Sequence, residues 1–284
     1  MRTTTLSALA AALSLAVCAV DARAHQLWLG ASNFLLSYPG ARPGPVSTCV
    51  FATFGHRFPI DEPIDDARFG GLYLHASAGA PRLLPAAAEG YRATPLAFER
   101  AGAYWIASAN RPIFSTQIKD AAGAMTYVRV PRNEAPAGAN VVDSTQIYGY
   151  AKALIFVQGD RADVSALSQP VGHRLELVPE ANPATAAAGG TIPVRVYFNG
   201  RPYAGESIEV LAESVAAPQK VPGARWSGET DRDGRVRVPL ALPGVWLLVV
   251  TVIEPTTGEL KAKASQIRFR ASLTFEVPGA AYGS

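Results

Sequence analysis

Alternation of apolar and polar residues over short runs is the feature of this sequence that most restricts its fold. Val194, Val196 and Phe198 alternate with more polar residues, and the same period recurs in residues 236–240 and 267–277. Successive side chains of a β-strand point to opposite faces, so a period of two is typical of strands with one buried face. No run of ten or more residues has the spacing of an amphipathic helix. The sequence therefore predicts an all-β fold.

Turn residues and chain length indicate how these strands are grouped. Asn199-Gly200 is typical of a tight turn, and residues 267–277 are interpreted as a pair of strands. One domain usually holds about 100 to 150 residues, so 284 residues are enough for two. With a linker near residues 169–172, we predict two β-sandwich domains, residues 25–169 and 170–284. The strand spacing of the second predicts an immunoglobulin-like or transthyretin (prealbumin)-like sandwich.

The first 24 residues have the features of a secretory signal peptide. Residues 6–20 are apolar, but they are fewer than the ~20 residues that span a bilayer. Ala22-Arg23-Ala24 fits the small-residue cleavage rule, so we predict cleavage after Ala24 and a periplasmic or secreted mature protein. Cys18 follows a lipobox-like run, which leaves a lipoprotein as the less favoured alternative. We expect no transmembrane span in the mature chain, since its most apolar run, residues 245–253, has the length of a strand.

Charge and motif content narrow the function classes. The formal net charge is +3, without a cluster of Lys and Arg. Because phosphate recognition needs clustered positive charge, we expect no nucleic-acid partner. The chain lacks Gly-x-Ser-x-Gly, Cys-x-x-Cys, His-Glu-x-x-His and a phosphate loop, so the familiar hydrolase types are disfavoured. We therefore predict a binding protein rather than an enzyme.

Among the four histidines, His25 has a special position. Cleavage after Ala24 makes it the mature N-terminus, where its α-amine and ring Nδ1 can chelate one metal ion. His56 would add a second imidazole and complete a three-nitrogen site, the histidine brace, if burial of Trp28 holds the N-terminal segment beside it. His173, close to the predicted domain boundary, is a further candidate ligand. The alternative is that these are ordinary histidines without a metal, as we expect for His75, which we predict to be solvated.

The metal that such a site would hold follows from its donor atoms. Nitrogen donors suit Ni²⁺, Co²⁺ or Cu²⁺, whereas Mg²⁺ and Ca²⁺ prefer oxygen. Raw affinity favours copper among these ions, so selectivity for nickel or cobalt would depend on geometry or supply.

Short segments spread over the mature chain form an ordered series of motifs. The series opens with His25-Gln26-Leu27-Trp28 and includes Gly55-His56-x-Phe58, Tyr150-x-Lys152-Ala153, Leu175-Glu176-Leu177-Val178-Pro179, Thr230-Asp231-x-Asp233-Gly234 and Leu273-Thr274-Phe275. It resembles a secreted bacterial family of unknown function, labelled a nickel uptake transporter family or the periplasmic component of a cobalt transport system. The resemblance implies a periplasmic protein that carries nickel or cobalt to an inner-membrane transporter, with His25 and His56 as ligands. Tyr150 and Lys152 match the pattern too, but we assign Lys152 no ligand role, because an ammonium must lose its proton to bind a metal.

Two functions of other classes stay open. A copper-dependent oxidase could use the same histidine brace on a β-sandwich. A metal-free adhesion, chaperone or assembly module could hold a partner protein through exposed edge strands.

Overall fold

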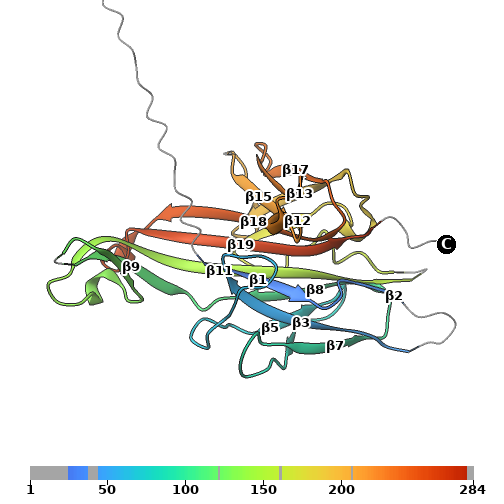
Figure 1. Cartoon of the computed structure of the whole chain (residues 1–284), viewed down its shortest axis with the longest axis horizontal. Coiled ribbons are helices and arrows are strands. Elements are labelled where there is room, and N and C mark those ends of the chain that lie inside the picture. The colour runs from blue at the N-terminus through green and yellow to red at the C-terminus, as the bar shows by residue number, and fades with distance from the viewer. Residues whose placement is uncertain (1–24, 38–43, 121, 160–161, 206, 280–284) are drawn as a thin grey trace, which may run out of the picture.

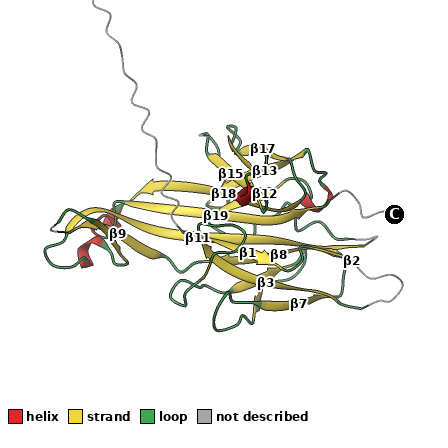
Figure 2. Ribbon diagram, in the orientation of Figure 1, coloured by secondary structure: helices red, strands yellow, loops and turns green. Residues whose placement is uncertain are grey.

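The computed structural model describes residues 25–37, 44–120, 122–159, 162–205 and 207–279. These residues form strands and four short 3-10 helices, without an α-helix: η1 (Arg132–Glu134), η2 (Pro183–Thr185), η3 (Ala217–Gln219) and η4 (Gly258–Ala262). Strands dominate the ribbon in Figure 2. The predicted all-β class is confirmed. The predicted signal peptide, with Cys18, lies outside the described residues.

Within the described residues the strands form three sheets. The first outer sheet contains β1 (Gln26–Ala31), β3 (Val46–Gly55), β4 (Glu62–Pro63) and β7 (Thr94–Phe98). The second outer sheet contains β12 (Leu175–Pro179), β13 (Gly190–Phe198), β14 (Arg201–Pro202) and β17 (Arg235–Leu240). The central sheet runs in the order β16 (Arg225–Glu229), β15 (Glu209–Ser214), β18 (Gly244–Pro255), β19 (Gln266–Val277), β11 (Asn140–Gln158), β8 (Gly102–Ala109), β5 (Leu72–His75) and β6 (Arg82–Leu84). Three more strands belong to this sheet: β2 (Leu35–Ser37) and β9 (Ile113–Lys119) pair with β11, and β10 (Met125–Val128) pairs with β9.

The three sheets are stacked in layers, with the outer sheets on opposite faces of the central one (Figure 1). Strand β11 shows how this arises, because Ala153 and Ile155 belong to the core under the first outer sheet. Its alternate residues Leu154 and Phe156 belong to the core under the second. A strand that is buried on both faces is apolar at nearly every position, as residues 153–157 are. The sandwich architecture predicted from the sequence is confirmed.

The central sheet joins the two predicted sandwiches. β11 comes from before the predicted boundary at residue 169 and β19 from after it, and they pair in parallel from Thr145↔Gln266 to Ala153↔Thr274. β19 also pairs with β18 along its whole length. It is one strand rather than the predicted pair, because residues 270–272 contain no glycine, proline or asparagine and both neighbouring strands pair with them. The boundary near residue 169 stays a prediction.

β1 lies on the central sheet over β11 and β19. The side chains beneath it are small, with Ala151 and Ser272 both buried, and the Ser272 hydroxyl donates to the Leu27 carbonyl at 2.7 Å. Trp28 has no exposed surface and packs on Phe58 and residues of β18, and its Nε1 donates to the Pro59 carbonyl at 2.8 Å. The expected burial of Trp28 is confirmed, and it holds β1 in place.

The described residues include no helix that is both long and apolar enough to cross a membrane.

Candidate functional site

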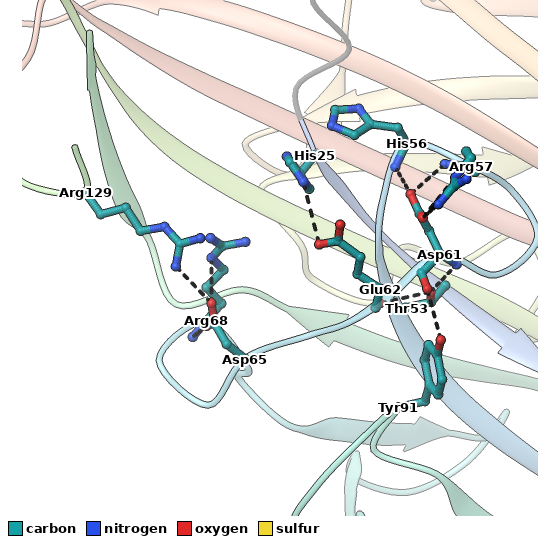
Figure 3. A network of polar contacts seen from close by, with 10 residues as sticks. All are labelled: His25, Thr53, His56, Arg57, Asp61, Glu62, Asp65, Arg68, Tyr91 and Arg129. Atoms are coloured by element: carbon teal, nitrogen blue, oxygen red, sulfur yellow. Dashed lines mark hydrogen bonds and ion pairs between the residues drawn. The ribbon is translucent and has the colours of Figure 1, made fainter. Parts of the chain in front are cut away.

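His25 and His56 lie side by side at one end of the first outer sheet (Figure 3). His25 precedes β1 and His56 follows β3, and these strands pair antiparallel with Gln26 opposite Gly55. This register brings the two imidazoles together, with ring centroids 4.1 Å apart and ring planes at 57°. The structure thus unites two of the three histidines that the sequence suggested as ligands.

The position of His56 depends on a buried carboxylate. Asp61, with only 5% of its side chain exposed, accepts hydrogen bonds from the backbone N–H groups of His56 at 2.7 Å and Arg57 at 3.0 Å. These bonds, led by that of His56, hold the pKa of Asp61 below its usual value. Gly55 has φ +144°, and a Cβ there would lie 2.3 Å from Asp61 Oδ2. Glycine is therefore required for the carboxylate to reach this backbone.

His25 is held by a stack and by a carboxylate. Its ring stacks on Phe54 with centroids 5.4 Å apart, and the Arg68 guanidinium lies 4.5 Å from the Phe54 ring. Its Nε2 is 3.8 Å from Glu62 Oε2. Figure 3 marks this contact with a dashed line. Burial, followed by the neighbouring His56, lowers the pKa of His25. The ring is therefore neutral at neutral pH, which is the form that binds a metal.

His173, the third candidate ligand, lies in a different cluster. Its ring packs against Tyr150 with centroids 5.1 Å apart. Burial lowers the pKa of His173 to about 4, and Glu176, Lys152 and His75 add smaller effects. These neighbours differ from those of His25 and His56, so His173 does not join the pair. His75, expected to be solvated, is half-buried beside the same cluster.

A buried ion pair lies at the centre of this second cluster. Lys152 and Glu176 are each 1% exposed, and Lys152 Nζ is 2.9 Å from Glu176 Oε2. The Glu176 carboxylate also accepts the backbone N–H groups of Val171, Gly172 and His173. The pair therefore ties β11 to β12 and to the predicted linker. Its polar atoms are used within the protein, which indicates a structural role.

Sequence reasoning missed the acidic partners in both clusters. Asp61 and Glu62 follow His56 closely, and the return of the chain as β4 beside β3 brings them to the histidines. For Lys152 the signal is its place in the apolar run 150–157, since a buried lysine needs a buried carboxylate. Glu176 sits in a comparable apolar strand, and only the fold pairs the two.

The capacity of the first cluster to hold a metal depends on the chain terminus. In the described part of the chain, no group of three or more His, Cys, Asp or Glu side chains is arranged to hold a metal ion. The exposed pair supplies two imidazoles, and the His25 α-amine would be the third nitrogen if the chain is cleaved after Ala24. The pair is accessible, because 45% of the His25 side chain is exposed.

A family comparison adds to this geometry. Residues 22–254 match the family model of a domain of unknown function, DUF4198. The chain belongs to the DUF4198 family. That description names no metal, so the nickel or cobalt cargo implied by the sequence resemblance stays a prediction. No curated protein matches the chain.

Solved structures with detectable similarity are distant. The D0-D1 domain of intimin is 11% identical, covers 88% of this chain and 97% of its own, and has a TM-score of 0.19. The FN1-FN3 domains of chicken CNTN1 are 6% identical, cover 89% of this chain and 98% of their own, and have a TM-score of 0.21. The native E. coli alpha-2-macroglobulin is 10% identical over 88% of this chain and 14% of its own, with a TM-score of 0.20. At such TM-scores these likenesses carry no argument about function.

Proposed function

We propose that this protein binds a divalent first-row transition metal through His25 and His56 in the periplasm and delivers it to an inner-membrane transporter. The observation that carries the proposal is the pairing of the two imidazoles at a centroid distance of 4.1 Å. One of them belongs to the residue that becomes the N-terminus after the predicted cleavage. The α-amine and Nδ1 of His25 would then form a chelate, with a His56 ring nitrogen as the third donor.

The surroundings of His25 support this arrangement. A histidine that binds a metal through one ring nitrogen usually presents the other to a carboxylate or carbonyl. Glu62 lies on the Nε2 side of His25, which leaves Nδ1, the nitrogen nearer the backbone, for the chelate. The lowered pKa of His25 reduces competition from protons at neutral pH.

The nature of the site favours carriage over permanent storage. The pair lies at the end of two strands and is partly exposed, so a partner could reach a bound ion. Nitrogen donors suit Ni²⁺, Co²⁺ and Cu²⁺, and the family resemblance favours nickel or cobalt. Copper stays the alternative cargo.

The decisive experiment is isothermal titration of Ni²⁺, Co²⁺ and Cu²⁺ into two forms of the protein. One form begins at His25, and the other carries one extra alanine before it, which moves the α-amine and keeps both imidazoles. We expect the first form to bind one ion. Removal of a residue that only contacts a metal ligand lowers metal affinity about 10- to 100-fold, and the extended form, which lacks a ligand itself, should lose more affinity than this.

Controls separate the chelate from unspecific binding. His56→Gln should weaken binding in the form that begins at His25, whereas His75→Gln should not, because His75 belongs to the other cluster. Equal affinity of the native and alanine-extended forms would rule out the chelate. Consumption of oxygen by the copper-loaded protein with a reductant would favour the oxidase instead.

The pH dependence gives a second test. The α-amine and imidazole have ordinary pKa values of about 8 and about 6.5, and both must be deprotonated to bind a metal. Affinity should therefore fall steeply between about pH 7.5 and about pH 5.5. Equal affinities at both values would mean that the ion binds elsewhere.

A further inference from the structure

A groove of about 360 Å³ opens beside His56 on the face of the central sheet that carries β1. Gln26 and His56 line one side of it, and Arg225, Trp226, Thr251 and Arg270 line other parts. Ligand pockets in proteins usually measure about 300 to 1,000 Å³, so the groove is large enough for a small organic molecule. The residues come from both sides of the predicted domain boundary.

The groove exists because the cover of the central sheet ends there. β1 lies over β11 and β19, whereas β15 and β16 continue the sheet beyond β18. Leu247 and Val249 form part of the floor and belong to the same apolar cluster as Trp28 and Phe58. Leu211 on β15 also lines the groove and is 39% exposed. The floor is thus a strand surface that solvent reaches at Leu211.

The charge of the lining is suited to an anion. It contains the two guanidinium groups of Arg225 and Arg270 and a single carboxylate, that of Glu213. Arg225 Nε is 3.3 Å from Glu213, and Arg270 Nε donates to the Thr251 hydroxyl at 3.2 Å. A guanidinium has five N–H donors in a planar fork, so one arginine can contact more than one acceptor at a time. Arginine also matches the planar geometry of a carboxylate.

The adjoining histidine pair would leave a bound ion both charged and incompletely coordinated. Three neutral nitrogen donors leave the full +2 charge of the ion in place. A tetragonal N,O site, typical of Cu²⁺ and Ni²⁺, needs at least one more donor. Asp61 cannot serve, because its carboxylate is occupied by the His56 and Arg57 backbone and the Arg57 guanidinium.

We propose that the groove binds a small organic chelator whose carboxylate completes the coordination of the ion at His25 and His56, while Arg225 and Arg270 hold its remaining carboxylates. The inference rests on the proposed function and defines its cargo as a metal–chelator complex rather than a bare ion. The occupant is a polycarboxylate small molecule, since the groove combines two arginines with an adjoining cation.

The experiment compares bare and complexed metal on the protein that begins at His25. Ni²⁺ alone, citrate alone and the Ni²⁺–citrate complex are titrated separately, with citrate as the probe for the class of carboxylate chelators. Citrate lowers the free Ni²⁺ concentration, so a protein that takes only the bare ion binds less as citrate rises. We expect the complex to bind at least about tenfold more tightly than the bare ion, the effect of one charge-assisted hydrogen bond.

Variants of the groove separate chelator recognition from metal binding. Arg225→Gln and Arg270→Gln should each weaken binding of the Ni²⁺–citrate complex about tenfold, because each removes one charge-assisted hydrogen bond. Neither should change the affinity for bare Ni²⁺. Arg201→Gln, on exposed β14, is the matched control and should change neither. The comparison of bare Ni²⁺ with the Ni²⁺–citrate complex uses the native protein, so it does not require any variant to fold.

The outcomes distinguish this inference from the proposed function. Binding of bare Ni²⁺ that citrate only competes away would overturn the groove inference and leave the metal function intact. Tight binding of citrate without metal would also overturn it, because the chelator is then not a metal ligand here. If neither bare nor complexed Ni²⁺ binds, both proposals fail.

Discussion

The chain keeps its histidines in two polar clusters that differ in burial. The pair His25 and His56 lies at a sheet end, where 45% of the His25 side chain is exposed. In the described part of the chain the His56 imidazole makes no hydrogen bond, and only its backbone N–H is used. His173 lies instead beside Lys152 and Glu176, which are each 1% exposed. The difference shows that a histidine becomes a candidate ligand through accessible ring nitrogens rather than through its presence in a polar cluster.

The two clusters also use carboxylates differently. In the buried cluster Glu176 accepts four donors, one of them the Lys152 ammonium. In the exposed cluster Asp61 orders the loop, whereas Glu62 stays 62% exposed near His25. Substitutions in the buried cluster should therefore change stability, and substitutions in the exposed cluster should change metal affinity.

The largest expected effect on stability is that of Lys152→Met. It leaves the Glu176 carboxylate buried without its cation, and breaking a buried pair in this way costs about 3 to 5 kcal/mol of unfolding free energy. Urea denaturation measures the loss. Lys261→Met, at an exposed position of η4, should change the unfolding free energy little. A loss below about 1 kcal/mol for Lys152→Met would contradict the structural role.

His173 should make stability depend on pH. Its pKa is about 4 in the folded protein and about 6.5 when unfolded, so the unfolded chain binds more protons between these values. The unfolding free energy should therefore fall by about 3 kcal/mol through this group as the pH drops from about 6.5 to about 4. In His173→Phe, which keeps a ring beside Tyr150, this part of the dependence should vanish. Parallel pH profiles for the two proteins would mean that His173 is not buried as a neutral group.

Gly55→Ala should affect both stability and metal binding. The added Cβ would meet Asp61 Oδ2 at 2.3 Å, and the strained backbone costs about 1 to 3 kcal/mol. The loop that carries His56 must then shift, so affinity for Ni²⁺ should fall in the same variant. Gly79→Ala tests backbone strain alone, because Gly79 has φ +94° and no atom within 4 Å of an added Cβ. It should leave metal binding intact; a similar loss in both variants would argue against the role of Asp61.

Glu62→Gln should have the smallest effect of these substitutions, and the effect should be on metal affinity rather than on stability. Loss of the carboxylate beside His25 Nε2 should weaken Ni²⁺ binding about tenfold, the lower end of the range for outer-shell partners. Unfolding free energy should change by less than about 0.5 kcal/mol, because the pair is exposed. Calorimetric titration and urea denaturation measure the two quantities, with exposed Glu99→Gln as control. A stability loss without a change in affinity would reverse the contrast between the clusters.

Part of the candidate site could be predicted from the sequence because its cause is local. His56 closely follows a run with strand character, residues 46–54, and His25 directly follows the predicted cleavage site. The expectation that Trp28 holds the N-terminal segment needed only the general tendency of a large aromatic ring to be buried. The hypothesis required the N-terminal segment to lie beside His56, and the antiparallel register of β1 with β3 meets this condition.

The rest depends on pairings between distant segments. Lys152 could be recognised as a buried cation, but its partner Glu176 lies on another sheet. The parallel pairing of β11 with β19 joins segments about 120 residues apart, and the groove beside His56 exists only because β1 stops short of β15 and β16. Alternation alone does not specify such partners, since any strand with one apolar face satisfies the same pattern.

The sequence by itself determined the all-β class, the alternating cores and the residue types available for a nitrogen-donor metal site, because these follow from short-range periodicity and side-chain chemistry. Only the tertiary structure decided that His173 lies apart from His25 and His56, and that Lys152 and Glu176 neutralise each other inside the protein. The physical reason is that burial and proximity arise from packing of the whole chain, and these decide whether a polar group is used internally or left accessible to a ligand.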